Sequence, residues 1–260
     1  DLYQLESGTD YNGALSLLAQ EIGATIDPYR PDAAADFAPA PKNDRTGGRR
    51  SDFSGAGNEV TPPEGKAAQS GDKSLTEPPA DFTDYYKSCK EHITDDAAQA
   101  YLTFRGLSND LAARYWLGYD PASGFLIIPA ARSFYLARNT DSAAKMRYKN
   151  PTGVSIELFN LKALYNDAAR PVFITEGAID ALSIIEAGGE AVALNSTSNT
   201  RKLLEQIRKQ RTRSTLIICL DNDDAGKKAA ASLADGLREL NIAFVTADIC
   251  GQHKDPNEAL

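Results

Sequence analysis

The chain has 260 residues, 42% of them hydrophobic, and a formal net charge of −8 at pH 7. This composition supports a sizeable core and argues against a protein held to nucleic acid by its overall charge, although it leaves room for local basic patches. No apolar run approaches the ~18 residues of a membrane span, and the three cysteines and two histidines show no metal-ligand spacing. We therefore expect a cytoplasmic protein with reduced thiols, no zinc in this fragment and no membrane segment.

The first 82 residues fall into two parts. Tyr11, Leu15, Leu18 and Ile22 recur at helical spacing, which predicts one amphipathic helix in residues 1–30. A single helix buries too little surface to fold alone, so we interpret it as the remnant of a larger upstream domain. Residues 31–82 contain seven of the thirteen prolines and few large apolar groups, and this composition predicts a flexible linker.

Residues 83–170 have the composition of a small α+β subdomain. Thr94 and Asp95 predict the start of a helix that Gly106 ends, and Ser108 predicts the cap of a second short helix. Two apolar, β-rich runs follow, at 125–128 and 134–137, and a third strand is expected near Tyr148.

Strands and helices alternate in residues 171–260. Apolar strands are predicted at 172–174, 191–194, 216–220 and 242–245, separated by helices at 179–187, 200–210 and 224–239. Continuous apolar strands that alternate with helices predict a parallel sheet covered on both faces. The expected fold class is therefore α/β.

Carboxylates follow three of these strands: Glu176 after the first, Asp221, Asp223 and Asp224 after the third, and Asp255 after the fourth. Ligands of open parallel sheets bind beyond the carboxyl ends of the strands. Two carboxylates 4 Å apart repel one another by roughly 4 kcal/mol at an effective dielectric constant near 20, so a cluster needs a cation. Oxygen ligands without His or Cys predict Mg²⁺ or Mn²⁺, as one or two ions.

Each acid also has a simpler interpretation. Asp223 and Asp224 are suited to capping the following helix, and Asp180 falls at a position that is normally solvated. Three acidic strand ends together favour the metal site.

Three motifs in order, Phe173–Leu182, Leu220–Gly226 and Lys254–Glu258, resemble the Toprim domain. The segments Tyr101–Ser108 and Leu117–Tyr119, then Arg147–Pro151 and Leu158–Asn160, resemble the polymerase core of bacterial, phage and mobile-element primases. The resemblance covers about 95–260. Its pattern departs at Asn257, where the family often has Asp, and at Asn195–Ser196, where Gly-Thr often follows the second strand.

The resemblance implies a Toprim domain, Rossmann-like, at 171–260 behind the primase subdomain at 83–170. It implies a DNA-directed RNA polymerase of the primase type that makes RNA primers on single-stranded DNA from ribonucleoside triphosphates, with a replicative helicase as partner in a primosome. Residues 1–82 then correspond to the tail of a zinc-binding domain whose ligands precede residue 1. The implied catalytic residues are Glu176, Asp221 and Asp223, and the implied metal ligands are Glu176, Asp180, Asp221, Asp223 and Asp255. Glu176 is either a ligand or the general base.

A basic strip at 132–149 carries five cations against the single acid Asp141, with two interleaved tyrosines. Such a strip is able to follow a single-stranded backbone while its rings stack on bases; the alternative is a solvated β surface. The expected nucleic-acid or nucleotide contacts are Arg132, Arg138, Lys145, Arg147, Tyr148, Lys149 and Asn150. A second basic stretch at 201–213 is interpreted as a solvated helix face.

Two other functions use the same residues. A Toprim nuclease of the OLD type would cut phosphodiesters with the same acids, and a non-catalytic Toprim module would bind nucleic acid without reacting.

Overall fold

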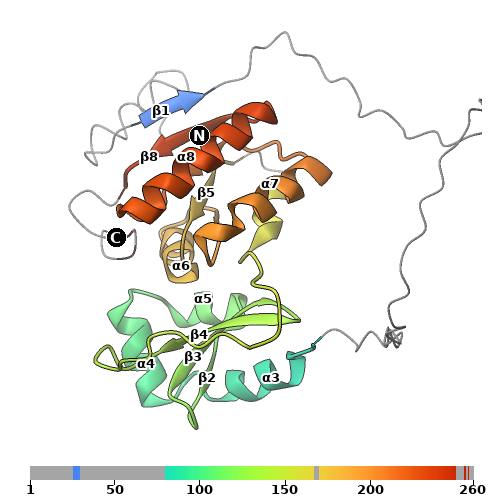
Figure 1. Ribbon diagram of the computed structural model, residues 1–260. Coiled ribbons are helices and arrows are strands. Elements are labelled where there is room, and N and C mark those ends of the chain that lie inside the picture. Colours follow the sequence, from blue (N-terminus) through green and yellow to red (C-terminus); the bar gives the residue numbers. More distant parts are fainter. Residues whose placement is uncertain (1–25, 30–79, 167–169, 250–254, 256, 258–260) are drawn as a thin grey trace, which may run out of the picture. The chain divides into compact units, whose positions relative to one another are not determined.

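Five strands form the larger of two sheets in the computed structural model of the chain, which describes residues 26–29, 80–166, 170–249, 255 and 257 (Figure 1). The strand order is β1-β8-β7-β5-β6. Four strands run parallel, namely β5 (Val172–Thr175), β6 (Ala191–Ala193), β7 (Leu216–Ile218) and β8 (Phe244–Ala247). The fifth, β1 (Ile26–Tyr29), pairs antiparallel with β8 at the edge.

Helices cover both faces of this sheet, as continuous apolar strands require. The helices α7 (Thr200–Lys209) and α8 (Asp224–Glu239) pack on one face, where Leu203, Ile207, Leu233 and Leu237 enter a core with strand residues. The helix α6 (Ala178–Glu186) contacts β5 and β6, and its side chains belong to a different core.

A smaller antiparallel sheet precedes the parallel one in the chain. Its order is β2-β3-β4, with β2 at Gly118–Asp120, β3 at Phe125–Ala131 and β4 at Phe134–Asn139. Three short helices accompany it: α3 (Thr83–Glu91), α4 (Asp96–Phe104) and α5 (Asn109–Arg114). Two 3₁₀ turns, η1 (Leu161–Tyr165) and η2 (Thr197–Asn199), complete the described elements. The Ser108 hydroxyl accepts a hydrogen bond from the Leu111 amide at 3.1 Å and so caps α5.

The helix α6 joins the two sheets through one core. Every residue from Ala178 to Ile185 is buried, and a helix buried on every side must have neighbours all around it. Ile179 and Leu182 share a cluster with Leu126, Phe134 and other residues of the antiparallel part. All described residues belong to one compact unit.

The predicted fold class is confirmed, with a parallel sheet behind a smaller α+β part. The third strand of the antiparallel sheet is β2, whereas Tyr148 makes an isolated bridge with Arg138. The strand β1 was not predicted, and the helix expected near 10–23 lies outside the described residues. No described helix has the length and apolarity needed to span a bilayer.

Candidate active site

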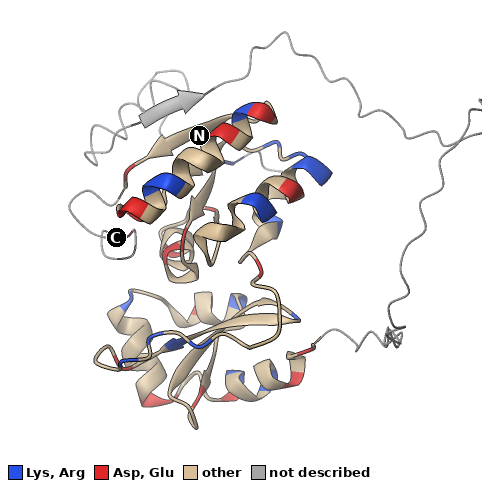
Figure 2. Ribbon diagram, in the orientation of Figure 1, with Lys and Arg blue, Asp and Glu red and all other residues tan. Residues whose placement is uncertain are grey.

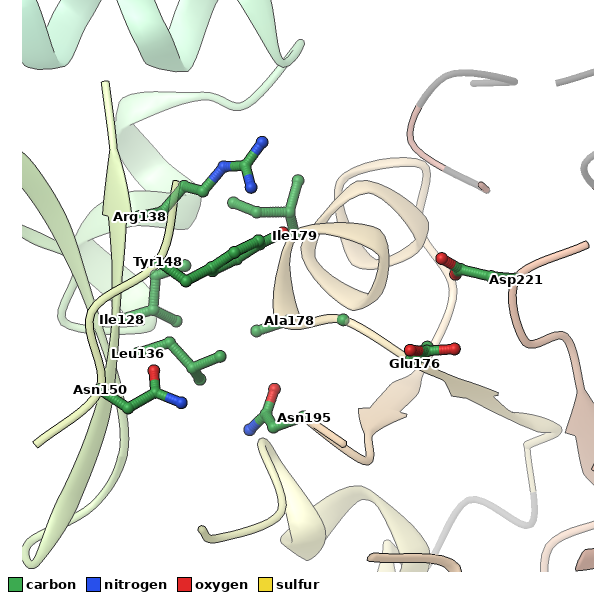
Figure 3. A pocket seen from close by; sticks show the side chains of 11 residues that line it. Ile128, Leu136, Arg138, Tyr148, Asn150, Glu176, Ala178, Ile179, Asn195 and Asp221 are labelled. Atoms are coloured by element: carbon green, nitrogen blue, oxygen red, sulfur yellow. The ribbon is translucent and has the colours of Figure 1, made fainter. Parts of the chain in front are cut away.

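The carboxyl ends of β5 and β7 form one wall of a cavity of about 270 Å³. The strand β6 lies on one side of β5, and β7 lies on its other side. The ends of β5 and β7 are therefore at the point where the strand order reverses, which is the usual ligand crevice of such sheets. Glu176 follows β5, Asp221 follows β7, and Figure 3 shows their carboxylates on the same side of the cavity. The lining is completed by Ile128, Leu136, Arg138, Tyr148, Asn150, Gly177, Ala178, Ile179 and Asn195.

Two glycines allow the helices to start close to these strand ends. A Cβ on Gly226 would lie 2.1 Å from the Asp221 carbonyl oxygen, so only glycine lets the first turn of α8 pass the end of β7. A Cβ on Gly177 would lie 2.6 Å from the Asp180 carboxylate. Glycine is therefore favoured at both positions because a larger residue would clash with an acidic residue of the same edge, Asp221 or Asp180.

Asp180 lies in the first turn of α6 and is 8% exposed. Its burial, followed by the negative charges of Asp255 and Asp221, raises the pKa of Asp180 to about 7, although the Asn257 amide donates to its carboxylate at 3.2 Å. The solvated position considered for Asp180 is wrong, because its side chain is buried and accepts a hydrogen bond from the Asn257 amide. Asp221 and Asp255 are thus close enough to Asp180 to repel its charge.

Asp223 has a different environment from Asp221. Its side chain is exposed, and its Oδ1 accepts a hydrogen bond from the Gly226 amide at 2.9 Å, which makes it the N-cap of α8. Asp224 is exposed in the first turn. The structure therefore gives Asp223 the capping role and does not place it in the lining of the cavity.

The donor chemistry at this edge fits a divalent cation, because hard carboxylate oxygens gather where Asp180 feels two like charges. Within the described part of the chain, no three His, Cys, Asp or Glu side chains are close enough to enclose an ion in this conformation. Glu176 and Asp221 on the cavity wall, with Asp180 and Asp255 beside them, are the residues that would hold it. All five predicted ligands, Asp223 among them, remain a prediction.

The opposite wall of the cavity carries a cation stacked on a ring. The Arg138 guanidinium lies 4.3 Å from the centroid of the Tyr148 ring, which is 54% exposed. The Arg138 Nε donates to the Tyr101 hydroxyl at 3.2 Å, and the Arg105 Nε donates to the same hydroxyl at 3.2 Å. Tyr101, which the sequence did not single out as a site residue, thus positions Arg138.

The rest of the basic strip lies outside the cavity lining. Lys145, Arg147 and Lys149 are exposed, with no side-chain hydrogen bond or ion pair to any described residue. Arg132 is exposed and lines a separate pocket. The second tyrosine of the strip, Tyr135, is partly buried and packs against the rings of Phe82, Tyr85 and Tyr86.

The basic stretch at 201–213 differs from the strip, because three of its cations have local partners. Arg201 pairs with Glu205 at 3.1 Å and Lys202 pairs with Glu157 at 2.7 Å. Arg211 donates to the Asn241 carbonyl oxygen at 2.7 Å. These contacts agree with a solvated helix face.

Both departures from the family pattern have structural reasons. The Asn257 amide group donates to the Ser183 hydroxyl at 2.6 Å and to the Arg105 carbonyl oxygen at 3.2 Å, while its Oδ1 accepts from the Arg105 guanidinium. An aspartate could not donate these bonds, so Asn257 ties α6 to the end of α4. Asn195 has a φ of 59°, and asparagine is among the few non-glycine residues that adopt this left-handed conformation readily.

Comparison with known proteins shows which proteins this chain resembles in sequence and in fold. Residues 173–260 match the family described as Toprim-like. The chain is 29% identical over 130 residues to a DNA primase of Mycoplasma genitalium; the match covers 48% of this chain and 21% of that relative, so the chain spans about a fifth of its length.

Solved structures extend the likeness beyond the Toprim-like part. The structure of the DnaG catalytic core matches with a TM-score of 0.54 and 18% identity, over 68% of this chain and 73% of that one. The fold is that of a DNA primase catalytic core. The zinc-binding and RNA polymerase domains of the Aquifex aeolicus primase match this chain with a TM-score of 0.52 and 18% identity, over 68% of this chain and 55% of that one. A DnaG catalytic domain bound to single-stranded DNA matches with a TM-score of 0.50 and 17% identity, over 68% and 72% of the two chains.

Proposed function

We propose that this chain is the RNA polymerase core of a DNA primase, which joins ribonucleotides into short primers on single-stranded DNA. The observation that carries the proposal is the single cavity between Arg138 and Tyr148 on one wall and Glu176 and Asp221 on the other. A cation with an aromatic ring suits a nucleic-acid strand or a nucleotide, and paired carboxylates suit the ion that phosphoryl transfer needs.

The residues of the acidic wall have distinct tasks in this proposal. Glu176 and Asp221, with Asp180 and Asp255, would hold Mg²⁺ or Mn²⁺, which supplies positive charge where the transferred phosphoryl group becomes more negative. Glu176 is the candidate to take the proton of the attacking 3′ hydroxyl, because it lines the cavity beside Asp221. Asp223 contributes by capping α8, which fixes the chain that leaves Asp221.

The opposite wall would hold the template and the incoming nucleotide. Arg138, kept in place by Tyr101 and by the ring of Tyr148, is suited to a phosphate, and the exposed face of Tyr148 to a base. The exposed Arg132, Lys145, Arg147 and Lys149 would add contacts along the DNA backbone, and Asn150 lies within the cavity lining. The resemblance adds a replicative helicase as partner and a bacterial, phage or mobile-element replicon.

One incubation separates this function from the alternatives. The chain is mixed with single-stranded DNA, labelled ribonucleoside triphosphates and Mn²⁺, with the Asp221→Asn variant as control. New short RNA that the variant does not make supports a primase. DNA fragments would identify a nuclease, and retention of DNA without either product would identify a binding module.

A further inference from the structure

Asn195 lines the cavity and is fixed by hydrogen bonds of both its backbone and its side chain. It follows β6, its backbone amide donates to the Glu176 carbonyl oxygen at 2.8 Å, and its side-chain Nδ2 donates to the Glu157 carbonyl oxygen at 2.8 Å. With the backbone at a φ of 59°, the side chain has a defined direction. The residue is therefore positioned from both sides, next to a proposed catalytic acid.

These contacts also fix which end of the amide faces the cavity. Turning the amide over would place Oδ1 against the Glu157 carbonyl oxygen, an acceptor against an acceptor. The Oδ1 of Asn195 is thus the end left over, and it is buried without a hydrogen-bond partner among the described residues. A buried acceptor without a partner costs stability, and in native proteins such groups need an explanation.

A second acceptor of the same kind lies on the other wall. Asn150 belongs to the segment after β4, lines the same cavity, and its Oδ1 is also buried without a partner in the described part of the chain. Figure 3 shows the two amide groups opposite one another, on the side of the cavity away from Arg138. Two amide oxygens without a described partner therefore border the cavity, in addition to its acids and its cation.

The chemistry of a nucleotide selects the group that would satisfy them. Phosphate oxygens accept hydrogen bonds and do not donate, and the donors on base edges differ from base to base. The ribose hydroxyls are donors that every ribonucleotide carries, and the 2′ hydroxyl distinguishes RNA from DNA. An acceptor that must serve all four nucleotides suits the sugar.

We propose that the Asn195 side-chain carbonyl accepts a hydrogen bond from a ribose hydroxyl of the nucleotide in the catalytic cavity, and so helps this chain to select ribonucleotides. The inference rests on the proposed function, which supplies the nucleotide. It makes Asn195 a specificity-determining residue at a position where related primases often have glycine.

The test compares Asn195→Gly with Asn160→Gly. Glycine keeps the left-handed backbone, so the variant loses the amide without adding strain. Asn160 is a matched control: its φ is 54°, its Nδ2 donates to the Ala191 carbonyl oxygen at 2.8 Å and its Oδ1 is buried without a described partner, yet it is not part of this cavity's lining. A general effect of the substitution on the fold would appear in both variants.

Equilibrium binding of ATP, 2′-deoxy-ATP and 3′-deoxy-ATP is measured with Mn²⁺ for the parent and both variants. We expect the parent to prefer ATP over at least one deoxy analogue, and Asn195→Gly to lose roughly three- to tenfold of that preference, the range of one neutral hydrogen bond. Asn160→Gly should keep the preference.

Each contrary result has a separate meaning. A parent that binds no ribonucleotide and makes no primer overturns the proposed function and this inference with it. A parent that makes primers but binds ATP and both analogues equally, or an Asn195→Gly variant that keeps the parent's preference, overturns the role of Asn195 alone.

Discussion

The basic strip at 132–149 and the acidic edge formed by Glu176, Asp180, Asp221, Asp223 and Asp255 differ in how far their charged side chains are buried. In the strip, Lys145, Arg147 and Lys149 are exposed. At the edge, Asp180 is buried at 8% exposure, and Glu176 and Asp221 are partly buried. Figure 2 shows that charged residues of both signs occur on both parts of the molecule, so the contrast lies in burial and not in a separation of charge.

This difference in burial predicts a difference in function. Exposed cations keep their hydration and contribute graded, salt-screened attraction to a strand. The buried carboxyl of Asp180 has its pKa raised by its burial and by the charges of Asp255 and Asp221, so removing a charge or a cation at this edge is expected to have a strong effect. Substitutions at the two regions should therefore differ in the kind of effect as well as in its size.

The largest effect is expected at the acidic edge. Asp221→Asn should lower primer synthesis by about 100-fold or more, because a ligand of the ion that stabilises the reacting phosphoryl group is lost. The fold should survive, since the amide has the same shape. Primer assays with circular dichroism measure both results.

The same comparison is sharpened by thermal melts with and without several millimolar Mn²⁺. The parent should gain stability from the ion by mass action, and an Asp221→Asn, Asp223→Asn double variant should not. Equal shifts in the two proteins would mean that these aspartates hold no metal.

The buried acid should make stability depend on pH in the absence of metal. The pKa of Asp180 rises from 3.8 to about 7 on folding, so between these values the folded chain binds the proton and the unfolded chain does not. The free energy of unfolding in EDTA should fall as pH rises from about 4 to 7, by at most about 1.4 kcal/mol per pH unit. Asp180→Asn should flatten this slope and be the more stable protein at pH 7, measured by urea unfolding. Asp224→Asn, at an exposed position, is the control, and a slope unchanged by Asp180→Asn would contradict the burial argument.

Removing cations from the strip should weaken binding without abolishing it. Arg147→Ala with Lys149→Ala should lower affinity for single-stranded DNA by about tenfold and reduce the salt slope by roughly 0.7 per lost phosphate contact. Arg208→Ala with Lys209→Ala removes the same charge from exposed positions of α7 and should change the slope less. Fluorescence anisotropy at several salt concentrations measures the affinity and the salt slope. Equal losses of affinity in the two double variants would mean that the strip acts only through its net charge and makes no specific contact with DNA.

The smallest effect is expected at Asp223, the acid with a structural role. Asp223→Ala should cost about 1 kcal/mol through the lost cap of α8, whereas Asp223→Asn should cost little, since asparagine caps nearly as well. Chemical unfolding without metal measures the difference. A loss of primer synthesis in Asp223→Asn at unchanged stability would show that Asp223 is a ligand as well as a cap.

Much of the parallel part follows from local pattern. The helix predicted at 224–239 is found at Asp224–Glu239, and the predicted strands overlap β5, β6, β7 and β8. Two helix caps also follow from the sequence, because Ser108 caps α5 and Asp223 caps α8 as their residue types predict. The strand β1 was missed because four residues next to a proline-rich stretch carry no periodic signal of their own.

The sequence by itself determined the order and type of these elements and the edge to which the acids belong, because strand and helix periods, caps and the rule for parallel strand ends depend on residues close together in the chain. Only the tertiary structure decided the environment of each acid. Asp180 is buried on a helix, α6, whose apolar side chains share a core with the antiparallel part, and Asp223 is exposed although it lies two residues from Asp221. The opposition of Asn150 and Asn195 likewise arises from segments 45 residues apart in the chain, and burial of this kind depends on long-range packing that no local pattern encodes.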